Sequence, residues 1–102
     1  MKKTYIILIL IAISISCEKK YKDLKLISRK NFERVIDGKE VDLFTLKNSN
    51  GLVTQITNYG GRVVSLWVPD KDGNFEDIVL GYETIEGYLE SNEIYFGALI
   101  GR

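Results

Sequence analysis

The chain of 102 residues contains no histidine and a single cysteine, Cys17. Without histidine the sequence cannot build Ser-His-Asp or Cys-His nucleophile systems, and it lacks the imidazole ligands of the usual zinc sites. A lone cysteine cannot form an intramolecular disulfide. These absences exclude histidine-dependent hydrolases, and they also exclude a scaffold held together by internal disulfides.

The sequence also lacks an apolar run long enough to cross a bilayer. Lys2-Lys3 precedes an apolar run over residues 5–15, about half of the roughly 20 residues that a transmembrane helix needs. A basic segment, an apolar segment and then small residues are typical of a secretory signal. We therefore expect a lipoprotein-type signal peptide over residues 1–16, and a transmembrane anchor is the weaker interpretation.

Cys17 lies where bacterial lipoproteins carry their acylated cysteine. Ser14-Ile15-Ser16-Cys17 resembles a relaxed lipobox, although Ser14 stands where a leucine-like residue is usual. We expect lipid attachment at Cys17, which would tether an exported bacterial protein to a membrane, facing the periplasm, without spanning it. The alternative is an ordinary signal peptide followed by an incidental thiol.

No large excess of positive charge is available for nucleic acid. The chain has 14 basic and 14 acidic residues, and removal of residues 1–16 takes away Lys2 and Lys3, which leaves 12 against 14. A basic field of the kind that binds phosphate backbones is therefore absent. Residues 17–28 mix basic and acidic side chains, which is typical of a solvated tether between an anchor and a domain.

From about residue 28 onward the pattern is that of β-structure. Asp37-Gly38 is the dipeptide of a type I′ hairpin, and the segment over 39–47 has apolar residues on both faces, which predicts burial between layers. Only one short segment has helical spacing, with Gly87 limiting it to about a turn. The alternation predicts strands over 32–36, 39–47, 52–58, 62–68, 75–81 and 94–100, with the helical turn over 84–89.

Short strands without strand–helix–strand alternation predict an all-β antiparallel sandwich. We expect residues 29–102 to form part of such a sandwich. A domain of this size buries a limited fraction of its surface, and its strands would have unpaired edges. We therefore expect the chain by itself to be poorly stable.

Several motifs have a structural interpretation that is stronger than a functional one. Asp70–Asn74 begins like a calcium loop, but its sixth and twelfth positions are Phe75 and Gly81, so a hairpin turn is expected. Gly60-Gly61 precedes a strand, which favours a tight corner over a phosphate loop. Paired carboxylates are expected on the surface, at Glu76-Asp77, Glu83 with Glu86 and Glu90 with Glu93. Aromatic residues are expected in the core, at Trp67, Tyr82, Tyr88, Tyr95 and Phe96.

A series of short motifs runs through the second half of the chain: Asn58-Tyr59-Gly60-Gly61, Val68-Pro69-Asp70, Gly73, Asp77-Ile78-Val79-Leu80-Gly81-Tyr82, Gly87-Tyr88-Leu89 and Tyr95–Arg102. Their order and spacing resemble those of the aldose 1-epimerase (galactose mutarotase) family. The resemblance implies the opening part of a large antiparallel β-sandwich that continues beyond Arg102.

The resemblance also implies interconversion of the α and β anomers of free aldoses, without a metal or an organic cofactor. In the family a histidine is the general acid and a glutamate the general base, and both would lie after Arg102. We therefore assign no catalytic, cofactor-binding or metal-binding residue in this chain, and only Cys17 as a lipid attachment site. The alternative function is a non-catalytic, lipid-anchored module that binds carbohydrate or protein.

Overall fold

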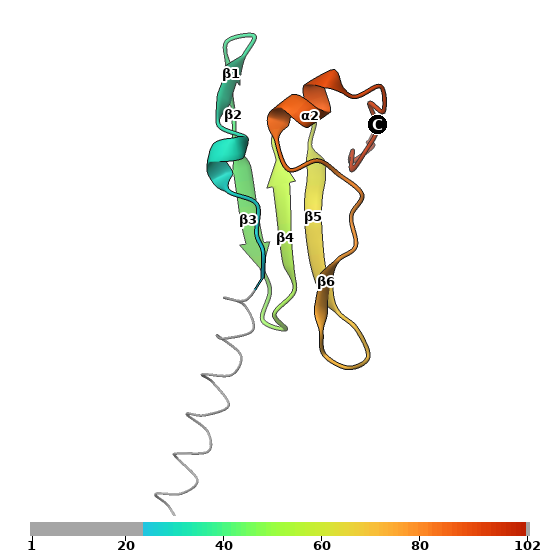
Figure 1. Ribbon diagram of the computed structural model, residues 1–102. Helices are drawn as coiled ribbons and strands as arrows, with labels where there is room; N and C mark the ends of the chain where they lie inside the picture. The colour runs from blue at the N-terminus through green and yellow to red at the C-terminus, as the bar shows by residue number, and fades with distance from the viewer. Residues whose placement is uncertain (1–23, 102) are drawn as a thin grey trace, which may run out of the picture.

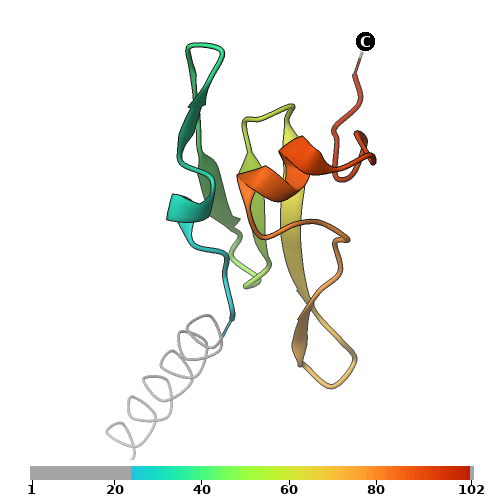
Figure 2. The same cartoon turned by 45° about the horizontal axis from the view of Figure 1, so that its top comes forward.

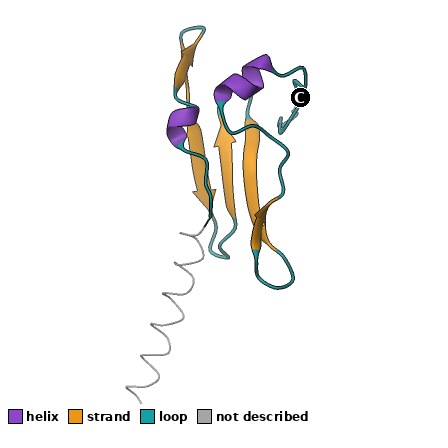
Figure 3. Ribbon diagram, viewed as in Figure 1, coloured by secondary structure: helices purple, strands orange, loops and turns teal. Residues whose placement is uncertain are grey.

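The computed structural model describes residues 24–101, which form strands paired only with antiparallel neighbours (Figure 1). A two-stranded hairpin precedes a four-stranded sheet of order β3-β4-β5-β6, and one short α-helix follows (Figure 3). This confirms the prediction of an all-β antiparallel fold. The elements are η1 (Arg29–Asn31), β1 (Arg34–Ile36), β2 (Lys39–Val41), β3 (Leu43–Lys47), β4 (Val53–Thr57), β5 (Arg62–Pro69), β6 (Phe75–Asp77) and α2 (Ile85–Glu90).

The first hairpin has the predicted turn. Ile36 pairs with Lys39, and the two residues between them have positive φ, 52° at Asp37 and 76° at Gly38. Positive φ at both central residues defines the type I′ turn, whose twist matches that of the flanking strands. The dipeptide therefore set both the position and the type of the turn.

The single strand predicted over 39–47 is wrong, because the chain breaks at Asp42 into β2 and β3. The backbone N–H of Asp42 donates to Asn58 Oδ1 at 2.9 Å, and its carbonyl accepts from Thr57 Oγ1 at 2.9 Å. Side chains thus take the place of a strand neighbour for both backbone groups. The ladder stops there, and β2 and β3 belong to different sheets.

The core lies on one face of the sheet, under α2 and the segment over 24–32 (Figures 1 and 2). The predicted helical turn forms α2, and Thr84 caps it by accepting a hydrogen bond from the N–H of Gly87. The helical spacing predicts one packed face of Ile85, Tyr88 and Leu89. Ile85 and Tyr88 are buried, whereas Leu89 is 38 % exposed. The buried cluster consists of Phe32, Val41, Leu43, Val64, Ile85 and Tyr88.

Gln55 joins the segment before η1 to the middle of the sheet. Its Oε1 accepts from Ile27 N at 2.9 Å, and its Nε2 donates to Ile27 O at 2.9 Å. Ser65 Oγ donates to the same Oε1 at 3.1 Å, and Nε2 also donates to Thr45 Oγ1 at 3.2 Å. The Gln55 side chain is 1 % exposed, and these bonds satisfy it as a buried amide requires.

The opposite face of the sheet stays open among the described residues. Phe44 is 50 % and Leu46 54 % exposed, whereas Leu43, on the covered face of the same strand, is 4 % exposed. The predicted burial of β3 on both sides is wrong, because Leu43 is the only residue of this strand that is buried. The sheet is one layer with an apolar outer surface.

The last two predicted strands differ from the structure. Of the strand predicted over 75–81, only Phe75–Asp77 pairs. Asp77 Oδ1 accepts from Leu66 N at 2.9 Å and from Val79 N at 3.1 Å. The N–H of Leu66 is therefore not available to pair with the backbone of a longer β6.

The strand predicted over 94–100 is wrong. A single bridge joins Ala98 to Arg62, and Ala98 N donates back to Tyr95 O at 3.0 Å. Gly97 has a φ of 69°, which bends the chain into a turn instead of a strand. Tyr95 is 69 % exposed, so its predicted place in the core is also wrong, while Tyr82 and Phe96 pack against the core as expected.

Candidate functional site

The predicted functional residue, Cys17, lies outside the described residues. Within residues 24–101 no helix is long and apolar enough to cross a membrane. The same part of the chain holds no group of three or more acidic, histidine or cysteine side chains placed to bind a metal ion. Among the described residues, a pocket beside the first hairpin, one of the surface pockets, and two arginine side chains come nearest to a site.

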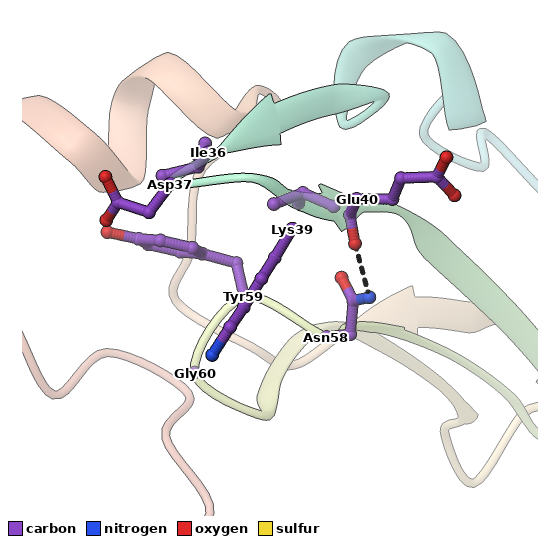
Figure 4. A pocket seen from close by; sticks show the side chains of 8 residues that line it. Ile36, Asp37, Lys39, Glu40, Asn58, Tyr59 and Gly60 are labelled. Atoms are coloured by element: carbon purple, nitrogen blue, oxygen red, sulfur yellow. Dashed lines mark hydrogen bonds between the residues drawn. The ribbon is translucent and has the colours of Figure 1, made fainter.

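The pocket lies between the β1–β2 hairpin and the β4–β5 turn (Figure 4). Its volume is about 320 Å³, which lies in the range of small-molecule sites. Apolar side chains and charged side chains both line it. The lining residues are Ile36, Asp37, Lys39, Glu40, Val41, Asn58, Tyr59 and Gly60.

Asn58 fixes the distance between the two walls of the pocket. Its Nδ2 donates to Glu40 O at 2.9 Å, and its Oδ1 accepts from Asp42 N at 2.9 Å. The amide therefore bridges the β4–β5 turn to the end of β2, as Figure 4 shows for Glu40. The alternation predicted Asn58 as the last residue of a strand over 52–58, and nothing in the local pattern indicates its bonds across 16 and 18 residues.

The polar groups of the pocket are distributed around the ring of Tyr59. Figure 4 shows the Asp37 carboxylate at the hydroxyl end of this ring, while the Lys39 side chain extends toward Gly60. The carboxylate of Glu40 is directed away from Tyr59. Asp37 and Lys39 are thus the charged side chains near the Tyr59 ring, and their opposite charges balance.

Arg62 supports the Tyr59 ring from outside the pocket. Its Cζ lies 5.1 Å from the centroid of Tyr59 and 5.4 Å from that of Tyr88, within cation–π range. Its Nη2 donates to Ile94 O at 2.8 Å. The Nε and Nη1 atoms are buried without a hydrogen-bond partner in the described residues, so the two rings are the main neighbours of the charge.

A second arginine, Arg29, forms an exposed pair with Asp42. Arg29 Nε donates to Asp42 Oδ1 at 2.6 Å, and Nη2 contacts Oδ2. The side-chain hydrogen bond from Arg29 holds the pKa of the Asp42 carboxyl below its usual value, and the N–H of Leu43 adds to the effect. The pair ties η1 to the junction between β2 and β3, which is a structural role.

The remaining charged motifs also have structural partners or lie on the surface. Glu86 pairs with Arg34 at 3.3 Å, and the carbonyl of Glu83 accepts from Asn31 Nδ2 at 3.1 Å. Burial raises the pKa of Tyr88, whose hydroxyl accepts from Tyr82 N at 3.3 Å. None of these groups forms a nucleophile–base pair.

The sequence profile of aldose 1-epimerases matches residues 42–102, more than half of the chain. The chain belongs to the aldose 1-epimerase family. Galactose mutarotase from Homo sapiens is 42 % identical over 65 residues, which are 64 % of this chain and 18 % of that protein. Aldose 1-epimerase from Escherichia coli K12 is 33 % identical over 66 residues, 65 % of this chain and 19 % of that protein.

A probable aldose 1-epimerase from Arthroderma benhamiae is 35 % identical over 57 residues, 53 % of this chain and 13 % of that protein. The chain therefore spans less than a fifth of the length of these relatives. No solved structure gives a significant match. The family assignment thus rests on sequence, and the antiparallel β-structure agrees with the fold that the resemblance implied.

The motifs shared with the aldose 1-epimerase family hold turns and close contacts in this part of the chain. Asp70 Oδ1 accepts from the N–H groups of Asp72 and Asn74, at 2.8 and 2.9 Å, which confirms a hairpin turn at this motif. A Cβ on Gly87 would lie 2.6 Å from Tyr82 Cβ, and one on Gly97 would lie 2.1 Å from Val63 O. These motif residues therefore build the scaffold.

Proposed function

We propose that this chain is the N-terminal part of an aldose 1-epimerase that interconverts the α and β anomers of free aldoses such as galactose or glucose. The observation that carries the proposal is the family match over residues 42–102, which includes all of the four-stranded sheet and α2. The names of the matched relatives, galactose mutarotase and aldose 1-epimerase, indicate the reaction.

Anomer exchange requires the sugar ring to open and close again. A general acid must deliver a proton to the ring oxygen, and a general base must remove one from the anomeric hydroxyl. The chain has no histidine, and its paired or exposed carboxylates lie in scaffold positions. We therefore place the acid and the base in sequence that follows residue 102, as the family resemblance implies.

The open face of the sheet supports this proposal over a self-contained binding module. Phe44 and Leu46 leave half of their surface exposed, and burying a large apolar side chain stabilises a fold by roughly 1.5–3 kcal/mol. A second layer from a longer chain would recover this free energy. A short module would instead need to unfold cooperatively as residues 17–102 alone, which a circular dichroism melt tests.

We also propose that the protein is exported and anchored through lipid on Cys17, with residues 17–28 between the anchor and the domain. The order of basic, apolar and small residues before Cys17 supports this. Labelling with a radioactive fatty acid in a bacterial host should mark the wild-type chain. The Cys17→Ala variant should carry no label, and equal labelling of both chains would refute acylation at this residue.

Polarimetry of freshly dissolved α-galactose tests the enzymatic proposal. The reading frame extended past the codon for Arg102 should yield a product that accelerates the approach to anomeric equilibrium. Residues 17–102 alone should leave it at the uncatalysed rate, since they lack the acid and the base. An extended product without activity would refute the assignment of function, and activity in residues 17–102 would refute the placement of the catalytic groups.

A further inference from the structure

The turn between β3 and β4 contains an asparagine that is followed by glycine. This residue, Asn50, is exposed and lies at the end of the sheet opposite α2 (Figure 1). Asparagine is one of the thermolabile residues of proteins. We propose that Asn50 is a site of spontaneous deamidation, at which the side-chain amide is converted into a carboxylate and ammonia is released.

The reaction needs only water and the backbone of the next residue. The nitrogen of Gly51 loses its proton and attacks Cγ of Asn50, so that an N–C bond forms, the Cγ–Nδ2 bond breaks and ammonia leaves. Water then opens the resulting cyclic imide. Opening at Cγ gives aspartate, and opening at the main-chain carbonyl carbon of residue 50 gives isoaspartate, in which the main chain runs through the former side chain.

Asn50 differs from every other asparagine of the chain in both groups that react. Its side-chain amide makes no hydrogen bond among residues 24–101, and Gly51 has no side chain to shield the attacking nitrogen. In the other asparagines the following residue carries a side chain, and for three of them the amide is also hydrogen-bonded. These are Asn31, Asn48, Asn58, Asn74 and Asn92.

The folded turn slows this reaction without preventing it. Gly51 N donates to Asn48 O at 3.2 Å, at the long end of the range for such bonds, so local opening of an exposed turn is enough to release the nitrogen. The neighbouring N–H groups of Asn50 and Leu52 are held more closely by Asn48 Oδ1, at 3.0 and 2.9 Å. We therefore expect deamidation in the folded chain to be slower than in the unfolded chain.

The isoaspartate product should loosen the end of the β3–β4 hairpin. Isoaspartate adds a methylene group to the main chain, and loop length fixes the register of a hairpin. Across this turn Lys47 pairs with Val53, and Asn48 N donates to Leu52 O at 3.1 Å. The isoaspartate fraction should therefore show faster amide exchange at Asn48, whereas the aspartate fraction should keep its protection.

The test incubates the full 102-residue chain in detergent at mildly alkaline pH, which favours loss of the backbone proton. Trypsin then releases residues 48–62, a peptide that contains Asn48, Asn50 and Asn58. Tandem mass spectrometry should locate the mass gain of amide-to-acid conversion at Asn50, at least about tenfold faster than at the other two asparagines. A parallel incubation in urea gives the rate for the unfolded chain.

Gly51→Asn tests the role of the glycine. Asparagine tolerates the φ of 84° at this position, and a Cβ there would meet only Phe75 Cζ, at 3.7 Å. This variant should slow conversion at Asn50 by at least about tenfold, and the matched control, Ser49→Ala in the same exposed turn, should leave the rate unchanged.

Three results would each overturn the proposal. They are equal rates at the three asparagines, an unchanged rate in Gly51→Asn, and no conversion in the folded chain over a period that converts the urea-unfolded chain. Because no sugar is present, these outcomes are independent of whether the epimerase proposal holds.

Discussion

Replacement of Gln55 by methionine should loosen the segment before η1 from the sheet. Methionine has nearly the volume of glutamine but neither accepts nor donates strong hydrogen bonds. In the Gln55→Met variant the N–H and the carbonyl of Ile27 lose their partners, both at 2.9 Å. Ser65, which is 0 % exposed, loses the acceptor of its hydroxyl.

The expected loss of stability follows from the groups left without partners. Each buried polar group left unsatisfied costs about 1–3 kcal/mol. The two backbone groups of Ile27 are partly buried, so together they imply a loss at the lower end of about 2–6 kcal/mol in the free energy of unfolding. Domains have about 5–15 kcal/mol in total. The substitution should therefore remove a large share of the stability while leaving the volume of the core nearly unchanged.

Urea unfolding followed by Trp67 fluorescence measures the change, and trypsin cleavage after Lys25 reports on local opening. Thr54→Val is the control on the same strand, because it removes only the bond from Thr54 Oγ1 to Ser65 O and should cost about 0.5–1.5 kcal/mol. A Gln55→Met protein as stable and as resistant to trypsin as the control would show that Gln55 does not hold the segment.

Two further substitutions test other contacts. Gly97→Ala should break the hydrogen bond from Val63 N to the carbonyl of residue 97, which is 2.8 Å long in the wild type, because a Cβ would lie 2.1 Å from Val63 O. Hydrogen exchange should show faster exchange of the Val63 amide. Unchanged protection of this amide would contradict the predicted clash. The hydrogen bond with Arg29 lowers the pKa of Asp42 in the folded state. The Asp42 carboxylate therefore stabilises the fold at pH values above its unfolded pKa of about 3.9. This stabilisation is lost as the pH falls through the lower pKa of the folded state. Asp42→Asn should flatten the pH dependence of the urea midpoint in this acid range, and an unaltered slope would show that the pair makes no contribution.

Local signals predicted the parts of the fold that depend on local chemistry. The positive φ values at Asp37 and Gly38 follow from their preference for type I′ turns, and the spacing of Ile85 and Tyr88 identified α2. Alternation placed β4 and β5 within a residue or two of their observed ends. Each of these features depends on neighbours in the sequence.

The features that were not predicted depend on side chains from distant residues. The break at Asp42 requires Asn58, and the early end of β6 requires the carboxylate of Asp77 to bond Leu66. The pocket escaped prediction for the same reason, since its two walls meet only after the chain has folded. Gly60-Gly61 was predicted to form a tight corner, and only the structure shows that Asn58, just before it, bridges to the end of β2.

The one-sided core has a consequence for the order of events during synthesis. The buried cluster and the partly buried residues packed against it lie between Ile27 and Phe96, so on the proposed longer chain this layer would be completed before later sequence left the ribosome. It finishes only when α2 has emerged, because Ile85 and Tyr88 fill its centre. Unless a further layer covers them, the exposed Phe44 and Leu46 present an apolar surface to solvent. A chaperone that binds exposed apolar surface would therefore act on the face that carries Phe44 and Leu46, after the covered face has folded.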